Sequence, residues 1–193
     1  MPEQQFDPES ILPGWAKEFA DGKKGVPFNG RERMKLAIEL SRLNIVHGTG
    51  GPFGAAVFEL ATGKLVSVGL NLAVRSSCSH AHAEMVAIAI AQHAVSSYTL
   101  CRPGERGYEL ASSCEPCAMC FGAIIWSGVN RVVCGASTAD ACNAGFDEGP
   151  KPALWVKELE RRGIEVETGV LQSEARNVLE YYSGNGGIIY NAR

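Results

Sequence analysis

Residues 113–126 read SCEPCAMCFGAIIW, and residues 82–84, earlier in the chain, read HAE. Each fragment stands immediately before or within an apolar run of helical character, and Pro116 suits the start of a helix. Imidazole and thiolate are the ligands that zinc prefers in a tetrahedral site. The sequence therefore predicts that one zinc ion per chain is held by His82, Cys117 and Cys120 at the beginnings of two helices.

A glutamate two residues after the histidine suggests that the predicted metal is catalytic. A catalytic zinc site keeps one position open for water, so Glu84 is not required as a fourth ligand. A carboxylate beside the metal can take and return a proton. The positive end of a helix dipole also favours the thiolate form of the two cysteines. Glu84 is accordingly predicted to be the general acid and base.

Two alternative ligand sets have to be considered. Cys114 lies three residues before Cys117, so Cys114, Cys117, Cys120 and His82 could form a closed structural site. Such a site would leave Glu84 without a function. His80 could replace His82, but only His82 is followed by a glutamate two residues later.

The composition is that of an ordinary globular protein. The 193 residues are 46% hydrophobic and 20% charged, and the net charge is −3, which argues against a nucleic acid as the partner. No signal peptide and no membrane-spanning run is recognised, so we expect no membrane partner. Seven cysteines, three of them clustered in residues 113–126, favour a reducing cytoplasm and a metal site over disulfides.

Helical and strand-like segments alternate along the rest of the chain. The sequence predicts helices over residues 31–46, 81–95, 117–127, 154–162 and 173–182, and strands over residues 55–60, 65–72, 129–135 and 164–170, with another strand ending near Ser113. This order predicts one α/β domain of three layers. We divide the chain into an N-terminal extension (1–29) with a short helix packed on the main body, a main domain that carries the predicted zinc site (30–171), and a C-terminal helix and tail (172–193).

With these residues identified, the chain resembles the cytidine deaminase superfamily, in which H-x-E…P-C-x-x-C is the zinc signature. GGPFGA at residues 50–55 and DACNAGFDE at residues 140–148 are most similar to the bacterial guanine deaminases. The resemblance implies an α/β/α fold with a mixed sheet of about five strands, one zinc per protomer and a homodimer. It also implies zinc-dependent hydrolysis of guanine to xanthine and ammonia, and leaves aminotriazines as further substrates.

The resemblance also implies substrate-binding and catalytic residues. Asn71 matches the asparagine that hydrogen-bonds the purine, and Phe53 matches the aromatic residue that stacks on it. Trp126 matches a tryptophan that lines the pocket, and Ala83 lies between the zinc ligand and the general base. Glu148 stands where the family has a second acid, usually aspartate, and would protonate the departing amine.

Less specific roles remain open for each of these residues. Asn71 could be a turn residue after a strand, Phe53 and Trp126 could be core residues, and Glu148 could be a solvated loop carboxylate. Guanosine or cytosine could be the substrate instead, as could the adenosine of a tRNA, although the acidic balance does not favour tRNA. A zinc-stabilised binding module without catalysis is the alternative from another class.

The last residues form a glycine-rich hinge followed by an apolar end. Residues 183–187 read SGNGG, and Ile188, Ile189 and Tyr190 follow. In the similar guanine deaminases the C-terminal segment crosses to the partner protomer and closes over the active site. We therefore expect Tyr190 or a neighbour to cover the pocket, with packing of the tail on its own domain as the alternative.

Overall fold

Five strands form one mixed sheet in the computed structural model of this protein, which describes residues 7–102, 104 and 106–191. The strands are β1 (Gly54–Glu59), β2 (Leu65–Leu70), β3 (Tyr108–Cys114), β4 (Arg131–Ala136) and β5 (Glu165–Glu167). Their order across the sheet is β2-β1-β3-β4-β5. The strand β1 is antiparallel to β2 and β3, whereas β3, β4 and β5 are parallel.

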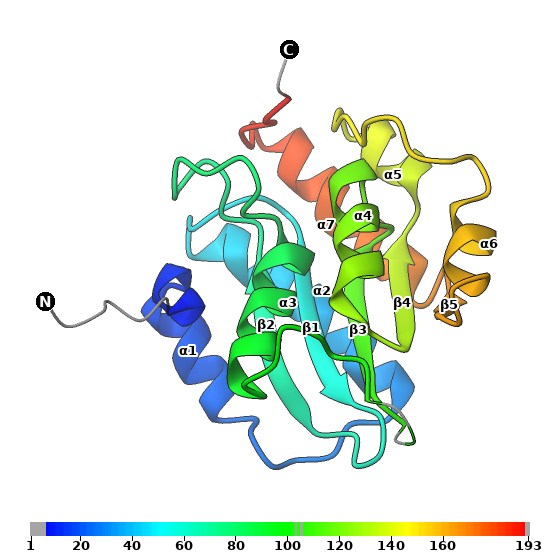
Figure 1. Ribbon diagram of the computed structural model, residues 1–193. Coiled ribbons are helices and arrows are strands. Elements are labelled where there is room, and N and C mark those ends of the chain that lie inside the picture. The colour runs from blue at the N-terminus through cyan, green and yellow to red at the C-terminus, as the bar shows by residue number, and fades with distance from the viewer. Residues whose placement is uncertain (1–6, 103, 105, 192–193) are drawn as a thin grey trace, which may run out of the picture.

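Helices cover both faces of the sheet, which gives the three predicted layers (Figure 1). On one face lie α3 (Ala83–Ala94) and α4 (Ala118–Ser127), and on the other lie α2 (Gly30–Val46) and α7 (Gln172–Gly184). The remaining helices are α1 (Gly14–Asp21), α5 (Thr138–Asn143), α6 (Trp155–Glu160) and a 3-10 helix, η1 (Pro8–Ile11). None of the helices in the described ranges is both long and apolar enough to cross a membrane.

The central strands are buried because apolar side chains on both of their faces are covered by helices. All seven residues of β3 are buried, as are five of the six residues of β1. Between parallel strands the chain has to cross over, and α4 makes that crossover from β3 to β4. This connection fixes the beginning of α4, and therefore Cys117, at the carboxyl end of β3.

The second predicted ligand helix is held against the sheet by a glycine. A Cβ atom at Gly69 would lie 2.0 Å from the backbone oxygen of Ala83 and 2.5 Å from the backbone nitrogen of Ala87. Only glycine therefore allows the first turn of α3 to pack this closely on β2. The same contact places His82, the N-cap residue of α3, near the carboxyl end of β3.

The predicted fold class is confirmed, and two elements differ from the prediction. The helix α5 was not predicted, although a capping box between Ser137 and Asp140 marks its start. The last strand is shorter than the predicted residues 164–170, because only Glu165–Glu167 pair with β4.

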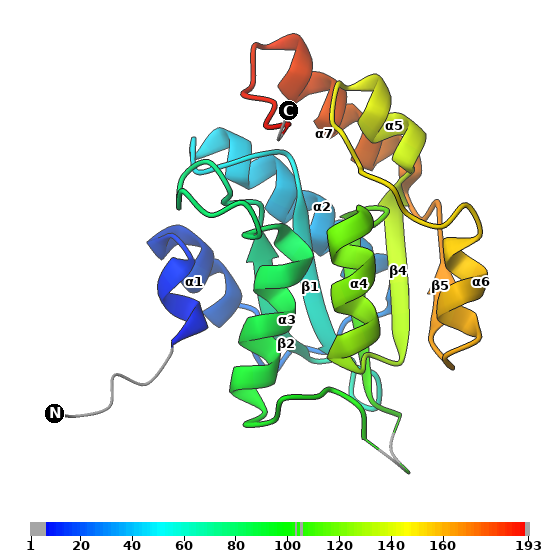
Figure 2. The same ribbon diagram turned by 45° about the horizontal axis from the view of Figure 1, so that its top comes forward.

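The predicted N-terminal extension packs on the main body through α1, with residues 1–6 outside the described ranges. Ala16 is fully buried, and Trp15 and Phe19 pack against the same core as α2 and β2. The views in Figures 1 and 2 agree that α1 lies at the β2 edge of the sheet.

Candidate metal centre and active-site cavity

Two helix beginnings meet at the predicted metal site. His82 is the N-cap of α3, Cys117 is the N-cap of α4, and Cys120 lies in the first turn of α4. His82 Nδ1 is 3.5 Å from Cys117 Sγ and 3.7 Å from Cys120 Sγ. The three ligand atoms all lie within 4.8 Å of one another. One imidazole and two sulfurs at this spacing match the donor set of zinc sites with three protein ligands.

The protonation state of Cys117 is already suited to a metal. A hydrogen bond from the Cys120 thiol, together with one from His82, lowers the pKa of Cys117 to about 4 although the residue is largely buried. The backbone N–H of Cys120 also points at Cys117 Sγ, at 3.5 Å, as expected for a side chain that caps a helix. A thiolate is the form that binds zinc, so Cys117 fits the ion. The hydrogen bond to Cys117 and burial raise the pKa of Cys120, so that zinc binding would release a proton from its thiol.

Glu84 lies beside the metal-binding group and is held in place from two sides. The hydroxyl of Ser112 donates to Glu84 Oε1 at 3.2 Å, and the Cys120 thiol lies 3.4 Å from Oε2. Burial raises the pKa of Glu84 above its ordinary value. A buried carboxylate that is fixed in position and ready to accept a proton is suited to acid–base chemistry.

Glu148 approaches the same site from the loop after α5. Its backbone oxygen accepts a hydrogen bond of 2.8 Å from the N–H of Ala118, the first residue of α4. Only 8% of Glu148 is exposed, and burial together with the negative charge of Cys117 and Glu84 raises its pKa to about 8. A carboxyl group whose pKa is raised in this way is suited to donate a proton.

A cavity of about 460 Å³ joins these groups to the residues predicted to bind a base. His82, Glu84, Cys117 and Glu148 line this cavity together with Asn71 and Phe53. The edge of the Phe53 ring meets Phe146, with ring centroids 4.8 Å apart. The volume and the aromatic lining suit a flat ring of the size of one purine.

Asn71 has a defined orientation at the end of β2. The N–H of Ala73 donates to Asn71 Oδ1 at 3.3 Å, and the backbone oxygen of Asn71 accepts from the N–H of Gly51 at 3.2 Å. Asn71 lines the cavity, and its side-chain amide nitrogen is a hydrogen-bond donor.

The C-terminal tail folds over the cavity of its own chain. Ile188 and Tyr190 line the cavity, and Asn191 is bonded to the loop that carries Glu148: its Oδ1 accepts from the N–H of Asp147 and its Nδ2 donates to the oxygen of Gly145. The hydroxyl of Tyr182 donates to the oxygen of Ile188 at 2.8 Å. Figure 2 shows the segment after α7 turning back over this end of the molecule. Residues 192 and 193 lie outside the described ranges.

The alternative ligands lie elsewhere. Cys114 is buried with its Sγ 3.8 Å from the backbone oxygen of Ser137, and it does not belong to the metal-binding group. His80 contacts Cys78 at about the distance of a weak hydrogen bond, 3.3–3.4 Å. The geometry therefore opposes a closed site with a fourth ligand from Cys114.

Two residues predicted to contact the substrate do not line the cavity of this chain. Trp126 is 85% exposed and lies outside the cavity. It is the ninth residue of α4, so the rise of the helix carries it about 12 Å from the end where the metal site lies. Ala83 is fully buried in the core at the start of α3, and its side chain does not line the cavity.

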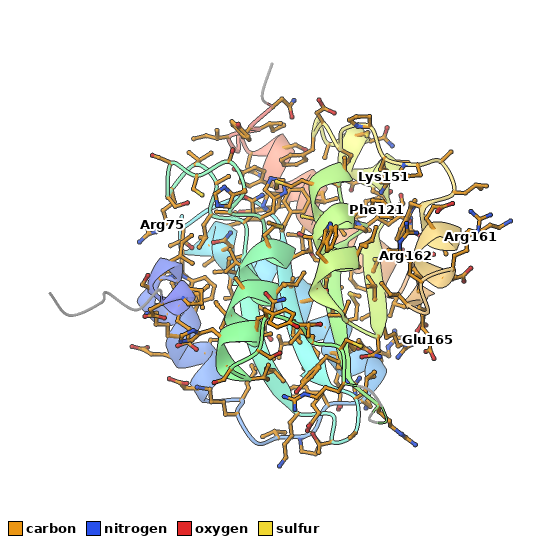
Figure 3. The ribbon with its side chains drawn as sticks, viewed as in Figure 1. Arg75, Phe121, Lys151, Arg161, Arg162 and Glu165 are labelled. Carbon is orange, nitrogen blue, oxygen red and sulfur yellow. The ribbon has the colours of Figure 1, made fainter. Side chains whose placement is uncertain are left out.

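Several residues that shape the site had no signal in the sequence. Lys151 Nζ donates to the backbone oxygen of Pro116 and to Thr138 Oγ1, both at 2.7 Å, and lies 3.9 Å from a Glu115 oxygen. This cluster ties the loop before Cys117 to α5. Figure 3 shows Lys151 beside the end of α4 that begins at the metal site. Arg75, also labelled there, lies on the loop after β2 and lines the cavity mouth.

The family comparison agrees with this geometry. Residues 29–136 match the family model for the cytidine and deoxycytidylate deaminase zinc-binding region, which includes all three metal-binding residues. The chain is 37% identical to the guanine deaminase of Bacillus subtilis over 115 residues, which are 60% of this chain and 69% of that protein. It is 32% identical to the tRNA-specific adenosine deaminase of the same species over 131 residues, covering 68% and 74% of the two chains.

Solved structures extend the likeness over nearly the whole chain. The guanine deaminase of Nitrosomonas europaea is 43% identical with a TM-score of 0.85, and 90% of this chain and 94% of that chain are covered. NE0047 in complex with 2,6-diaminopurine is 45% identical with a TM-score of 0.86, covering 94% and 95% of the two chains. The likeness therefore includes segments on both sides of residues 29–136.

Proposed function

Because this chain belongs to the cytidine and deoxycytidylate deaminase family of zinc-binding proteins, we propose that it is a guanine deaminase, which hydrolyses guanine to xanthine and ammonia. The observation that carries this proposal is that one cavity is lined by two buried carboxyl groups, Glu84 and Glu148, by His82 and Cys117 of the metal-binding group, and by Asn71 and Phe53. The likeness to guanine deaminases at 37% and 43% identity supports the same substrate.

His82, Cys117 and Cys120 would hold one zinc ion per chain. Zinc bound there supplies an activated nucleophile, because it lowers the pKa of water towards about 7. We also propose a reducing compartment such as the cytosol, because the seven cysteines, all within the described residues, are free.

Glu84 and Glu148 would divide the proton transfers between them. The amine of guanine is attached to C2, between N1 and N3 of the ring. As water oxygen forms a bond to C2, Glu84 takes a proton from the water and delivers it to N3. Glu148, whose pKa is raised to about 8, gives a proton to the amine nitrogen, so that the C2–N bond breaks with ammonia as the leaving group. The proton of the new C2 hydroxyl returns to Glu148 as the C2=O of xanthine forms, which restores both carboxyl groups. Each acid–base role is worth roughly 10²–10⁴ in rate.

Asn71 and Phe53 would select the base. The Asn71 side chain can donate to the purine because its Oδ1 is already engaged by the N–H of Ala73. A cytosine or an adenine would present a different pattern of donors and acceptors and leave buried polar groups unpaired. Aminotriazines carry an amine between two ring nitrogens, so they share the reacting group and are candidates for slower substrates.

The tail would exclude water during the reaction. Ile188 and Tyr190 line the cavity, and Asn191 anchors them to the loop before Glu148. A lid of this kind keeps bulk water from solvating the departing amine. It also opposes a tRNA substrate, since a tRNA loop would have to displace the tail, and the net charge of −3 does not favour an RNA partner.

We further propose that the chain forms a homodimer through the exposed side of α4. Met119 and Trp126 are exposed, and Trp126 is seven residues after Met119, so both lie on one side of the helix. Figure 3 shows the half-buried Phe121 on the face of α4 turned away from the sheet. Tryptophan, methionine and phenylalanine are enriched in protein–protein interfaces, which explains why so apolar a helix is only partly buried here.

The test of the proposed activity is product analysis with purified, zinc-loaded protein. Incubation with guanine should yield xanthine and ammonia in equal amounts, whereas a non-catalytic zinc module would yield neither. Guanosine and an aminotriazine tested in parallel would show whether a ribose or a smaller ring is accepted.

A further inference from the structure

The helix α1, which precedes the region matched by the family model, reaches the wall of the active-site cavity through one side chain. The Trp15 ring stacks on His47, with centroids 4.6 Å apart and an angle of 13° between the planes. Trp15 Nε1 donates a hydrogen bond of 3.2 Å to Thr49 Oγ1. Thr49 lines the cavity, so the N-terminal segment is one hydrogen bond away from it.

From Thr49 a chain of hydrogen bonds continues to Asn71. Thr49 Oγ1 donates to Asn44 Oδ1 at 2.7 Å. Asn44 Nδ2 then donates to two backbone oxygens, that of Gly51 at 2.8 Å and that of Asn71 at 2.9 Å. This series of hydrogen bonds thus ends at Gly51, which lines the cavity, and at Asn71, the residue proposed to hydrogen-bond the purine.

The direction of every bond in this chain is fixed by chemistry. An indole N–H can only donate and a backbone oxygen can only accept. The amide of Asn44 must therefore turn its nitrogen towards Gly51 and Asn71 and its oxygen towards Thr49, whose hydroxyl has one proton to give. The Thr49 hydroxyl lies 2.7 Å from Asn44 Oδ1 and 3.3 Å from the backbone oxygen of Asn44, so the nearer side-chain oxygen is the better acceptor for its proton.

Burial makes this series of hydrogen bonds rigid. Asn44 is fully buried and Thr49 is 7% exposed, so losing a partner would leave a polar group without water to replace it. The cavity wall is also closely packed at Gly50, because a Cβ atom there would lie 2.0 Å from the backbone oxygen of Asn71 and 2.8 Å from Asn44 Nδ2. A shift of Asn44 would therefore move both the wall and Asn71.

We propose that Trp15, Thr49 and Asn44 are positioning residues, and that the N-terminal segment braces the purine-recognising wall, Gly51 and Asn71, through them. None of the three is required for proton transfer. We call this set of contacts, from Trp15 through Thr49 and Asn44 to the wall, the brace. It rests on the proposed function only because Asn71 is taken to bind the purine. It gives residues of α1 a role that their position outside the zinc-binding region does not suggest.

Three substitutions and a matched control test the brace. Trp15→Phe keeps an aromatic ring beside His47 but removes the N–H. Thr49→Val keeps the shape and removes the hydroxyl, and Thr49→Ser restores it. Phe19→Leu is the control, because Phe19 lies on the same helix and packs on the core without joining the hydrogen-bond chain. All are compared with the wild-type holoenzyme after zinc content and melting temperature have been measured.

Two kinds of measurement are made on each variant. Hydrogen exchange of the Gly51 and Asn71 amides reports on the wall itself, whatever the substrate. The Kd for xanthine, the product that cannot react further, and the kcat and KM for guanine report on substrate binding.

In Trp15→Phe and Thr49→Val we expect the two amides to exchange about tenfold faster and the Kd for xanthine to rise about tenfold, which corresponds to about 1.4 kcal/mol. The KM for guanine should rise with it, while kcat changes by less than about twofold, as when ground-state binding alone is weakened. Thr49→Ser and Phe19→Leu should exchange at the wild-type rate at both amides.

The brace is overturned if Trp15→Phe and Thr49→Val exchange at the wild-type rate at Gly51 and Asn71, or if Phe19→Leu accelerates both amides equally. A wild-type protein that neither deaminates guanine nor binds xanthine would instead contradict the proposed function. The exchange rates would still decide whether Trp15 holds this wall.

Discussion

Glu84 and Glu148 are both buried carboxyl groups in one cavity, yet their surroundings give them different tasks. Glu84 accepts a hydrogen bond from Ser112 and lies beside the sulfur of Cys120, next to the metal-binding group. Glu148 lies on the loop after α5, and burial together with the negative charge of Cys117 and Glu84 raises its pKa to about 8. One is placed to accept a proton and the other to donate one, which is what hydrolysis of a C–N bond requires.

Glu84→Ala should separate metal binding from catalysis. The substitution removes the group that moves the proton and leaves His82, Cys117 and Cys120 in place, so we expect full zinc content and a fall in kcat of about 10²–10⁴ or more. Zinc is measured by metal analysis and kcat by ammonia release. Cys114→Ser is the control and should keep both, because Cys114 lies outside the metal-binding group. Loss of zinc in Glu84→Ala would make Glu84 a ligand and contradict the assignment.

Glu148→Gln tests the second acid. The amide cannot donate a proton to the leaving nitrogen as an acid does, so kcat should fall far more than KM rises. Glu148→Asp keeps the acid on a shorter side chain and should retain partial activity. If Glu148→Gln turned over guanine at the wild-type rate, Glu148 would take no part in the chemistry.

The sequence alone predicted the residues whose chemistry is distinctive. His82, Glu84, Cys117, Cys120 and Glu148 were identified from motifs, and the structure brings all five to one site. Thr49 and Lys151 were missed because a threonine and a lysine far from any motif carry no chemical signal, and only the fold brings them to the site. Trp126 was assigned to the pocket on the resemblance alone, and in a single chain it lies near the far end of α4, outside the cavity.

At the scale of elements, the metal site depends on two helix beginnings and one tail. Gly69 allows α3 to pack on β2, and the crossover through α4 places Cys117 at the end of β3. The tail after α7 then closes the cavity with apolar side chains. A hinge of glycines leads into it, and Gly187 has no room for a side chain because a Cβ atom would lie 2.5 Å from the ring of Tyr182.

Deletion of residues 187–193 should remove the lid without unfolding the protein, because residues 187–191, the part of this segment that the structure describes, form no strand or helix. We expect the truncated protein to bind zinc and to melt within a few degrees of the full chain, while kcat/KM for guanine falls by more than about tenfold as water enters the site. Asn191→Ala, which removes only the two hydrogen bonds to the Gly145–Asp147 turn, should give a smaller fall. Unchanged kcat and KM after the deletion would mean that the tail only packs.

Elements with strong periodicity were easier to predict than short ones. The helix α2 and the hairpin of β1 and β2 were predicted within a few residues, because each has a long amphipathic or β-prone pattern. The six-residue helix α5 was missed, since its capping box is a weaker signal than an apolar stripe. The end of the last strand was set by pairing with β4, which local sequence does not encode.

At the scale of the whole molecule, the outer side of α4 is apolar but exposed in a single chain. The helix α4 leaves Trp126 and Met119 exposed on its outer side, whereas most large apolar residues in the described ranges are buried or partly buried. Pairing of two such faces would bury them and would be isologous, with the same residues contributed by both protomers.

Trp126→Ser should therefore shift the protein from dimer to monomer at micromolar concentration. The substitution removes the largest apolar side chain of the proposed interface, and truncation of a central tryptophan typically costs 2 kcal/mol or more, roughly a thirtyfold weakening. Sedimentation velocity over a range of concentrations measures it. Tyr98→Ser serves as the control, because Tyr98 is 91% exposed but lies beyond the end of α3. A wild-type protein that is monomeric at every concentration would contradict the dimer.

The most direct test of the whole account is the ratio of kcat/KM for guanine to that for cytosine, measured on the zinc-loaded wild-type protein. A cavity in which Asn71 and buried carboxyl groups are arranged for a purine lactam leaves polar groups unpaired when a pyrimidine binds, so we expect a ratio of about 10⁴ or more in favour of guanine. Values of kcat/KM within about tenfold of each other for the two bases would contradict a site built for guanine.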